Sequence, residues 1–177
     1  MLKIGLLGCG RIGQVHARSV GQLDDVRITA LSDANPEAAQ ALALKTGAEV
    51  RSSDAVIASE DVDAVVIGTP TDTHYDLIHK AAAAGKAIFC EKPVDMSADR
   101  IRDCQKAVAK AGVPFLTALN RRFDPSFSNL QKRLRAGEIG DVEIVSILSR
   151  DPAPPPISYI KTSGGLFRDM MIHDLDM

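Results

Sequence analysis

The stretch Gly5-Leu6-Leu7-Gly8-Cys9-Gly10-Arg11-Ile12-Gly13 decides the predicted fold. The apolar run over residues 2–7 has the length of one buried strand, and residues 14–20 carry apolar side chains at helical spacing. Gly8, Gly10 and Gly13 therefore form G-x-G-x-x-G at a strand-to-helix turn. In this pattern the first glycine permits the tight turn, the second lets the backbone approach a pyrophosphate, and the third lets the helix pack closely.

Asp33 adds a second part to the pattern. It follows the apolar run over residues 26–31 and lies 33 − 13 = 20 residues after Gly13. At this spacing a carboxylate reaches the ribose hydroxyls of a bound adenosine, while the helix N-terminus attracts the pyrophosphate. The plainer alternative is a glycine-rich turn with a surface aspartate. Ala34 and Asn35 follow in place of an arginine, and the charge of Asp33 repels a 2′-phosphate, so NAD is predicted over NADP.

Composition narrows the class of protein. The chain of 177 residues is 45% hydrophobic and 25% charged, and its formal net charge is −2. This charge favours neither nucleic acid nor an anionic membrane as a partner. No apolar run reaches the length of a membrane span, and the predicted strand at residues 2–7 leaves no room for a signal peptide. We therefore expect a globular protein that binds neither nucleic acid nor a membrane.

Three cysteines bear on the compartment. Cys9, Cys90 and Cys104 have no metal-type spacing, and an odd number cannot all pair. We interpret them as reduced thiols of a cytoplasmic protein.

Strands and helices alternate along the first 120 residues. Asn35 followed by Pro36 marks a helix start. Alternation with apolar strands of this kind predicts an α/β fold with a doubly wound parallel sheet of Rossmann type. Strands are expected at 2–7, 26–32, 48–51, 63–68, 86–91 and 113–119, with helices at 11–20, 35–47, 54–59, 73–84, 97–112 and 124–136.

The alternation stops after Asn120. Residues 141–150 alternate apolar and polar side chains, which indicates a longer strand that begins another sheet. A proline-rich loop at 152–156 follows, and then a final helix that begins near Leu166 and is still running at Met177. We therefore expect an α/β domain over 1–120 and the incomplete beginning of a second, α+β domain over 121–177, as part of a longer protein.

Ligands of such sheets lie beyond the carboxyl ends of the strands, so the residues that follow each strand are the candidates for cofactor binding. His74 heads the helix after Thr71, where it would either help close the cofactor cleft or simply begin the helix. The candidates are Gly8, Gly10, Arg11, Ile12, Gly13, Asp33, Thr69, Pro70, Thr71, His74, Glu91, Lys92 and Asn120.

Asp169 and His173 lie four residues apart on the predicted final helix and so share one face. An acid that orients an imidazole suits general-base catalysis, although an ordinary surface pair fits the spacing equally well. A metal site is the weaker alternative, since the histidine is followed by Asp174 and Asp176 and lacks a second histidine at ligand spacing. No metal is expected.

Together these motifs resemble the Gfo/Idh/MocA oxidoreductases. The resemblance covers the whole chain and depends on its glycine turn, on Thr69-Pro70-Thr71 with His74, on Glu91-Lys92-Pro93, and on Gly164-Gly165 with Asp169 and His173. It implies NAD in the first domain, and a second domain that shapes the substrate pocket and the oligomer interface of a homo-oligomer.

The resemblance also implies the chemistry. It assigns Lys92, Asp169 and His173 to catalysis, Arg122 and Asp151 to the substrate side, and a cis peptide to Lys92–Pro93. The implied reaction is NAD-dependent oxidation of a ring secondary alcohol of a cyclitol, such as myo-inositol, to the ketone. Two alternatives to this reaction remain: a related sugar dehydrogenase, and a non-catalytic NAD-binding sensor or scaffold. Because much of the second domain is absent, weak or no turnover is expected of the 177 residues alone.

Overall fold

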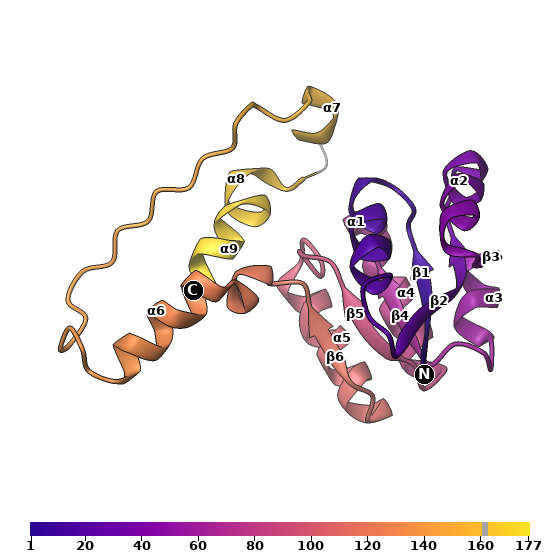
Figure 1. The fold of residues 1–177 in the computed structure, drawn as a ribbon, viewed down its shortest axis with the longest axis horizontal. Coiled ribbons are helices and arrows are strands. Elements are labelled where there is room, and N and C mark those ends of the chain that lie inside the picture. The colour runs from indigo at the N-terminus through magenta and orange to yellow at the C-terminus, as the bar shows by residue number, and fades with distance from the viewer. Residues whose placement is uncertain (161–162) are drawn as a thin grey trace. The chain divides into compact units, whose positions relative to one another are not determined.

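The computed structural model describes residues 1–160 and 163–177, and these form two compact units, Met1–Ala118 and Leu119–Met177. The first unit contains one six-stranded parallel sheet with helices on both faces (Figure 1). Its strand order, β3-β2-β1-β4-β5-β6, is the doubly wound Rossmann order, and the order reverses between β1 and β4. The predicted fold class is therefore confirmed.

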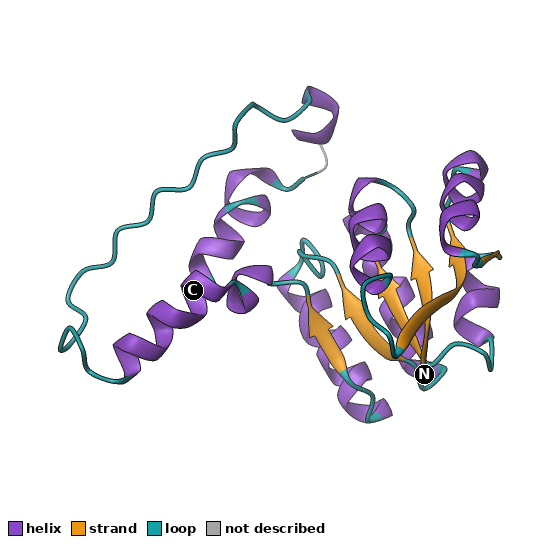
Figure 2. Cartoon of the chain, in the orientation of Figure 1, coloured by secondary structure: helices purple, strands orange, loops and turns teal. Residues whose placement is uncertain are grey.

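The elements of the first unit lie where the alternation of the sequence predicts them, with small shifts at their ends (Figure 2). The largest shift is in the sixth strand, which shortens from the expected 113–119 to β6 (Phe115–Thr117). The other strands are β1 (Leu2–Leu7), β2 (Val26–Ser32), β3 (Glu49–Val50), β4 (Ala64–Ile67) and β5 (Ala87–Cys90). The helices are α1 (Arg11–Val20), α2 (Pro36–Thr46), α3 (Ser53–Ala58), α4 (Thr71–Ala83) and α5 (Ala98–Ala111).

Two apolar layers cover the sheet, which explains why its strands are almost continuously hydrophobic. One layer packs Leu7 of β1 and Ile67 of β4 with Ile78 of α4. The other packs Leu6 of β1 with Leu42 of α2. Successive side chains of β1 therefore enter opposite layers, as the pleat of a strand requires.

The ends of α2 show how local sequence sets an element. The Asn35 side chain accepts hydrogen bonds from the backbone N–H groups of Glu37 and Ala38, at 3.0 and 3.4 Å. Gly47 ends the helix in the left-handed region, at φ 73°. Asn35 therefore caps the helix start that the sequence predicts, and Gly47 caps the other end.

The second unit is built differently. It contains the short helices η1 (Asn120–Phe123), α7 (Ile157–Ile160), α8 (Gly165–Asp169) and α9 (Met171–Leu175), and the longer α6 (Pro125–Arg135). None of its described hydrophobic residues is buried. The assignment of residues 121–177 to a second, substrate-binding domain stays a prediction.

Two predicted elements of the second unit are wrong. Residues 141–150 form no strand, although they lie extended, because a strand needs a hydrogen-bonded neighbour and the described residues supply none there (Figure 2). Their apolar side chains are exposed, including Ile144 at 87% and Leu148 at 80%. The single helix expected from Leu166 onward is instead α8 and α9, separated at Met170. The break is local, because Met170 keeps a right-handed conformation at φ −102° and ψ −56°.

The three cysteines are free and buried. Burial raises the pKa of the Cys9 thiol to about 11, with the Asp33 charge adding to the effect. Burial likewise raises the pKa of Cys104 to about 11. These thiols are therefore protonated and unreactive near neutral pH.

The described helices include none that is both long and apolar enough to cross a membrane.

An ion-pair cluster connects the end of β3 to the loop before β4. The Arg51 guanidinium donates to both carboxylate oxygens of Asp61, at 2.8 and 3.0 Å, and to Glu49 at 2.7 and 2.9 Å. The Ser59 hydroxyl also donates to Asp61. The bonds from Arg51 and then Ser59 hold the pKa of the Asp61 carboxyl well below its usual range.

Asp61→Asn should therefore lower the melting temperature at pH 7. A carboxyl whose pKa is depressed by folding adds stability above its unfolded pKa, near 3.8, and loses that contribution as the pH falls through the folded value. The gap in melting temperature between the two proteins should thus narrow below about pH 4. Thermal scans from pH 7 to pH 3 measure it, with the exposed Asp24→Asn as the matched control; a gap independent of pH would contradict this account.

Candidate functional site

The glycine turn between β1 and α1 has the tightest backbone packing of the site. Gly8 has φ +99°, and a Cβ added there would lie 2.5 Å from the Gly68 carbonyl oxygen. A Cβ on Gly13 would lie only 2.0 Å from the Gly8 carbonyl oxygen. No side chain fits either space, so these two glycines let α1 begin directly against the turn.

Gly10 differs from its neighbours because its surroundings are open. A Cβ added at Gly10 would meet no atom within 4 Å, and no side chain caps the N-terminus of α1. The first N–H groups of a helix have no partner within it, and they bind anions where a ligand can approach. The residues present thus fit the pyrophosphate of a dinucleotide.

Asp33 lies beside this turn. Its Oδ2 accepts a hydrogen bond from the Cys9 backbone N–H at 2.6 Å, and its Oδ1 accepts one from the Asn35 N–H at 2.7 Å. A carboxylate oxygen has two lone pairs, so each can accept a further hydrogen bond from a ribose hydroxyl. The structure therefore brings Asp33 to the glycine turn, as the spacing of the sequence predicts.

His74 connects two of the predicted loops. Its ring is 1% exposed, with Nε2 at 2.9 Å from the Thr69 carbonyl oxygen and Nδ1 at 2.9 Å from the Pro93 carbonyl oxygen. It thus links the loop after β4 to the loop after β5, a placement that its position at a helix start does not reveal. The Lys92–Pro93 peptide, directly before the Pro93 carbonyl, is cis, which confirms the predicted cis bond.

Glu91 has a partner that sequence reasoning missed. His16 of α1 lies with Nε2 at 2.7 Å from Glu91 Oε1, and both side chains are mostly buried. The other oxygen of Glu91 accepts the Lys92 backbone N–H at 3.3 Å. Glu91 therefore holds the backbone of Lys92 on one side and α1 on the other. The contact spans 75 residues, and no local signal in the sequence predicts it.

The predicted acid and base of the second unit lie on either side of the break at Met170. Asp169 ends α8 and His173 lies in α9. The Tyr159 hydroxyl of α7 donates to Asp169 Oδ1 at 2.8 Å, a contact that the sequence did not suggest. The predicted roles of Asp169 and His173 stay predictions.

The two predicted substrate-side residues have different surroundings. Arg122 is engaged within the second unit, because its Nε and Nη2 donate to the carboxylate of Asp176 at 2.7 and 2.5 Å. This contact raises the pKa of its guanidinium further. Asp151 and Asn120 are exposed.

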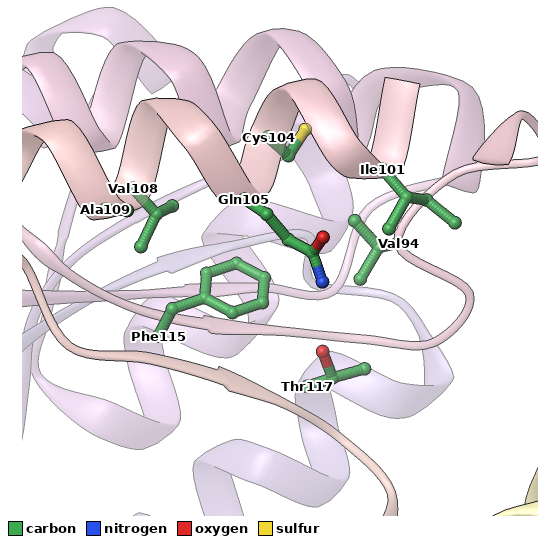
Figure 3. A pocket seen from close by; sticks show the side chains of 8 residues that line it. All are labelled: Val94, Ile101, Cys104, Gln105, Val108, Ala109, Phe115 and Thr117. Atoms are coloured by element: carbon green, nitrogen blue, oxygen red, sulfur yellow. The ribbon is translucent and has the colours of Figure 1, made fainter. Parts of the chain in front are cut away.

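A cavity of about 320 Å³ lies between α5 and β6 (Figure 3). Its lining is mainly apolar and includes none of the predicted cofactor or substrate residues. We therefore do not assign the dinucleotide to it. The lining residues are Val94, Ile101, Cys104, Gln105, Val108, Ala109, Phe115 and Thr117.

Comparisons with known proteins agree with the Rossmann fold of the first unit. Residues 2–119 match the model of an oxidoreductase family with an NAD-binding Rossmann fold, GFO_IDH_MocA. The chain is 56% identical to inositol 2-dehydrogenase of Rhizobium meliloti over 99% of its own length and 53% of the relative.

Solved structures are similar over the same range. The crystal structure of a myo-inositol dehydrogenase from Corynebacterium glutamicum is 45% identical, with a TM-score of 0.92, over 99% of this chain and 53% of that one. A scyllo-inositol dehydrogenase from Lactobacillus casei, solved with NAD(H) and scyllo-inositol, is 31% identical with a TM-score of 0.87, over 99% and 54%. The chain thus spans about half the length of the curated relatives it matches.

Two glycine substitutions should separate folding from binding. Gly10→Ala places a methyl group in open space, so it should leave the melting temperature nearly unchanged while weakening dinucleotide binding. Gly13→Ala forces a methyl group against the Gly8 carbonyl and should lower the melting temperature. Thermal scans and calorimetric titration with NAD measure the two effects. Normal NAD affinity in Gly10→Ala would show that the pyrophosphate lies elsewhere.

Proposed function

This chain belongs to the Gfo/Idh/MocA oxidoreductases, and from that premise we propose that the protein is an NAD-dependent cyclitol dehydrogenase. The proposed reaction oxidises a ring secondary alcohol, as in the conversion of myo-inositol to its 2-ketone. The observation that carries the proposal is the 56% identity to an inositol 2-dehydrogenase over nearly the whole chain. The open glycine turn with Asp33 beside it supports NAD as the cofactor.

Each residue has a proposed task. Bound NAD supplies the nicotinamide carbon that accepts a hydride from the alcohol carbon. His173 takes the hydroxyl proton, because a neutral imidazole is a suitable base near neutral pH. Asp169 orients that ring, and the positive charge of Lys92 stabilises negative charge that develops on the substrate oxygen. Arg122 and Asp151 would bind the other hydroxyl groups of the ring.

The Glu91 contacts support the proposed task of Lys92. A catalytic ammonium group must be held in place by its surroundings. The backbone N–H of Lys92 bonds to Glu91, which is itself bound to His16 of α1. The helix that offers its N-terminus to the pyrophosphate is thereby connected to the loop that carries Lys92.

The proposal extends to the cell and to assembly. We propose a cytoplasmic location, because three buried free thiols suit a reducing compartment. We also propose a homo-oligomer for the longer protein. NADH formation by the full-length protein, followed by absorbance with cyclitols and aldoses in turn, tests the function. Turnover of aldoses alone would favour a sugar dehydrogenase, and NAD binding without any turnover would favour a sensor.

Asp33→Ala should reduce the preference for NAD. The carboxylate can accept hydrogen bonds from the ribose hydroxyls, so its loss should weaken NAD binding. It also repels a 2′-phosphate, so its loss should remove this repulsion of NADP. Calorimetric titrations with both dinucleotides measure the ratio of dissociation constants. Equal affinities for NAD and NADP in the unchanged protein would contradict the assignment of Asp33.

His173→Ala should lower kcat by about 10²–10⁴-fold, the usual contribution of a general base. NAD affinity should stay unchanged, because the assigned cofactor residues lie in the first 120 residues. Steady-state kinetics of the full-length protein with myo-inositol measure kcat, and fluorescence titration measures NAD binding. His79→Ala, which removes a histidine of α4 outside the proposed machinery, is the control. A wild-type kcat in His173→Ala would remove this residue from the proposed mechanism.

A further inference from the structure

One guanidinium in the second unit contacts three other segments. Arg121 of η1 pairs through Nη1 with Asp174 of α9, and its Nη2 donates to the Ser149 hydroxyl at 3.0 Å. Its guanidinium carbon also lies 5.8 Å from the centre of the Phe127 ring in α6, within cation–π range. We call Arg121, Phe127, Ser149 and Asp174 the Arg121 cluster.

The Arg121 cluster contributes more to the order of this unit than it would in a unit with an apolar core. None of the described hydrophobic residues of the second unit is buried, so apolar packing does little to hold its helices. The Arg121 and Asp174 side chains are only 23% and 12% exposed, which makes their ion pair one of the most enclosed in this unit. An enclosed pair is screened less than an exposed one, and the fork of an arginine fixes direction as well as distance.

The partners of Arg121 adjoin the residues assigned to chemistry. Asp174 follows His173 directly in α9, and Ser149 precedes Asp151 by two residues. Arg121 therefore contacts the two segments that carry His173 and Asp151. The pair Arg122–Asp176 makes a second connection between η1 and the C-terminal segment, one residue after Arg121 and two residues after Asp174.

We propose that Arg121 is a positioning residue for His173. It acts through Asp174, which fixes the backbone and orientation of α9, and it does not touch the substrate itself. The ion pair with Asp174 is the essential contact, and Ser149 ties the segment before Asp151 to the same group. The assignment rests on the proposed function, because His173 is its target.

Arg121→Gln removes the charge, and Asp174→Asn removes its partner. In the full-length protein, either variant should lower kcat by about 10²-fold, the usual cost of misplacing a catalytic group by about 1 Å, while NAD affinity is unchanged. The double variant should lose no more than either single variant, because both act through one contact. Arg121→Lys keeps the charge without the fork and should recover part of kcat.

Arg133→Gln is the matched control, because it breaks an arginine–carboxylate pair of the same unit, with Glu138 at 2.6 Å. It should leave kcat and KM unchanged. Equal losses in Arg133→Gln and Arg121→Gln would overturn the proposal, as would additive losses in the double variant. A kcat near wild type in both Arg121→Gln and Asp174→Asn would do the same.

A second readout does not depend on turnover. Diethylpyrocarbonate labels imidazole rings, and peptide mass spectrometry can compare His173 with His79 of α4 in the same sample. Arg121→Gln and Arg121→Lys should raise the labelling rate of His173 relative to His79, with the larger rise in the glutamine variant. If Arg121→Gln does not fold, Arg121→Lys and Asp174→Asn decide the matter, and an unchanged His173 rate in both overturns the proposal.

The two proposals can fail separately. If the unchanged full-length protein binds NAD but oxidises no cyclitol, the proposed function fails, while the labelling experiment still decides whether Arg121 positions His173. If turnover is normal and labelling and kcat are both insensitive to Arg121, only the positioning role fails.

Discussion

The close approach of α1 to the end of β1 is the constraint on which the nucleotide-binding half depends. The backbone at Gly13 passes so near the Gly8 carbonyl that even one added carbon would overlap it. This contact sets the start of the helix at the edge of the sheet, with Gly10 left open. It also brings the Cys9 N–H to the Asp33 carboxylate, so the residues proposed to bind the phosphates and the ribose lie at the same turn.

Polar contacts hold the neighbouring loops. His74 lies between two carbonyl groups, and Glu91 lies between His16 and the Lys92 backbone. Enclosed polar groups of this kind are costly when unpaired and directional when paired. The loops after β4 and β5 therefore gain defined positions without becoming part of the apolar core. Such fixed loops suit the proposed site, in which Lys92 contacts the substrate.

The two units achieve order by different means. The first has apolar layers on both faces of its sheet, while the second has exposed apolar side chains along residues 141–150 and ion pairs between its helices. Two arginines of η1 reach aspartates that lie 53 and 54 residues later in the sequence. In a unit of this kind, a single charged residue can determine where a short helix lies.

Local patterns in the sequence determined most of the first unit. The glycine spacing, the apolar runs and the Asn35 cap act over a few residues, so they predicted the strands, the helices and the place of Asp33. Only the tertiary structure decided the pairings of His16 with Glu91, Tyr159 with Asp169, and Arg121 with Asp174, because no local propensity encodes contacts across the folded chain. The same reason explains the wrong strand at 141–150. Alternation records which face of a strand would be buried, but a strand forms only where a neighbour completes its hydrogen bonds.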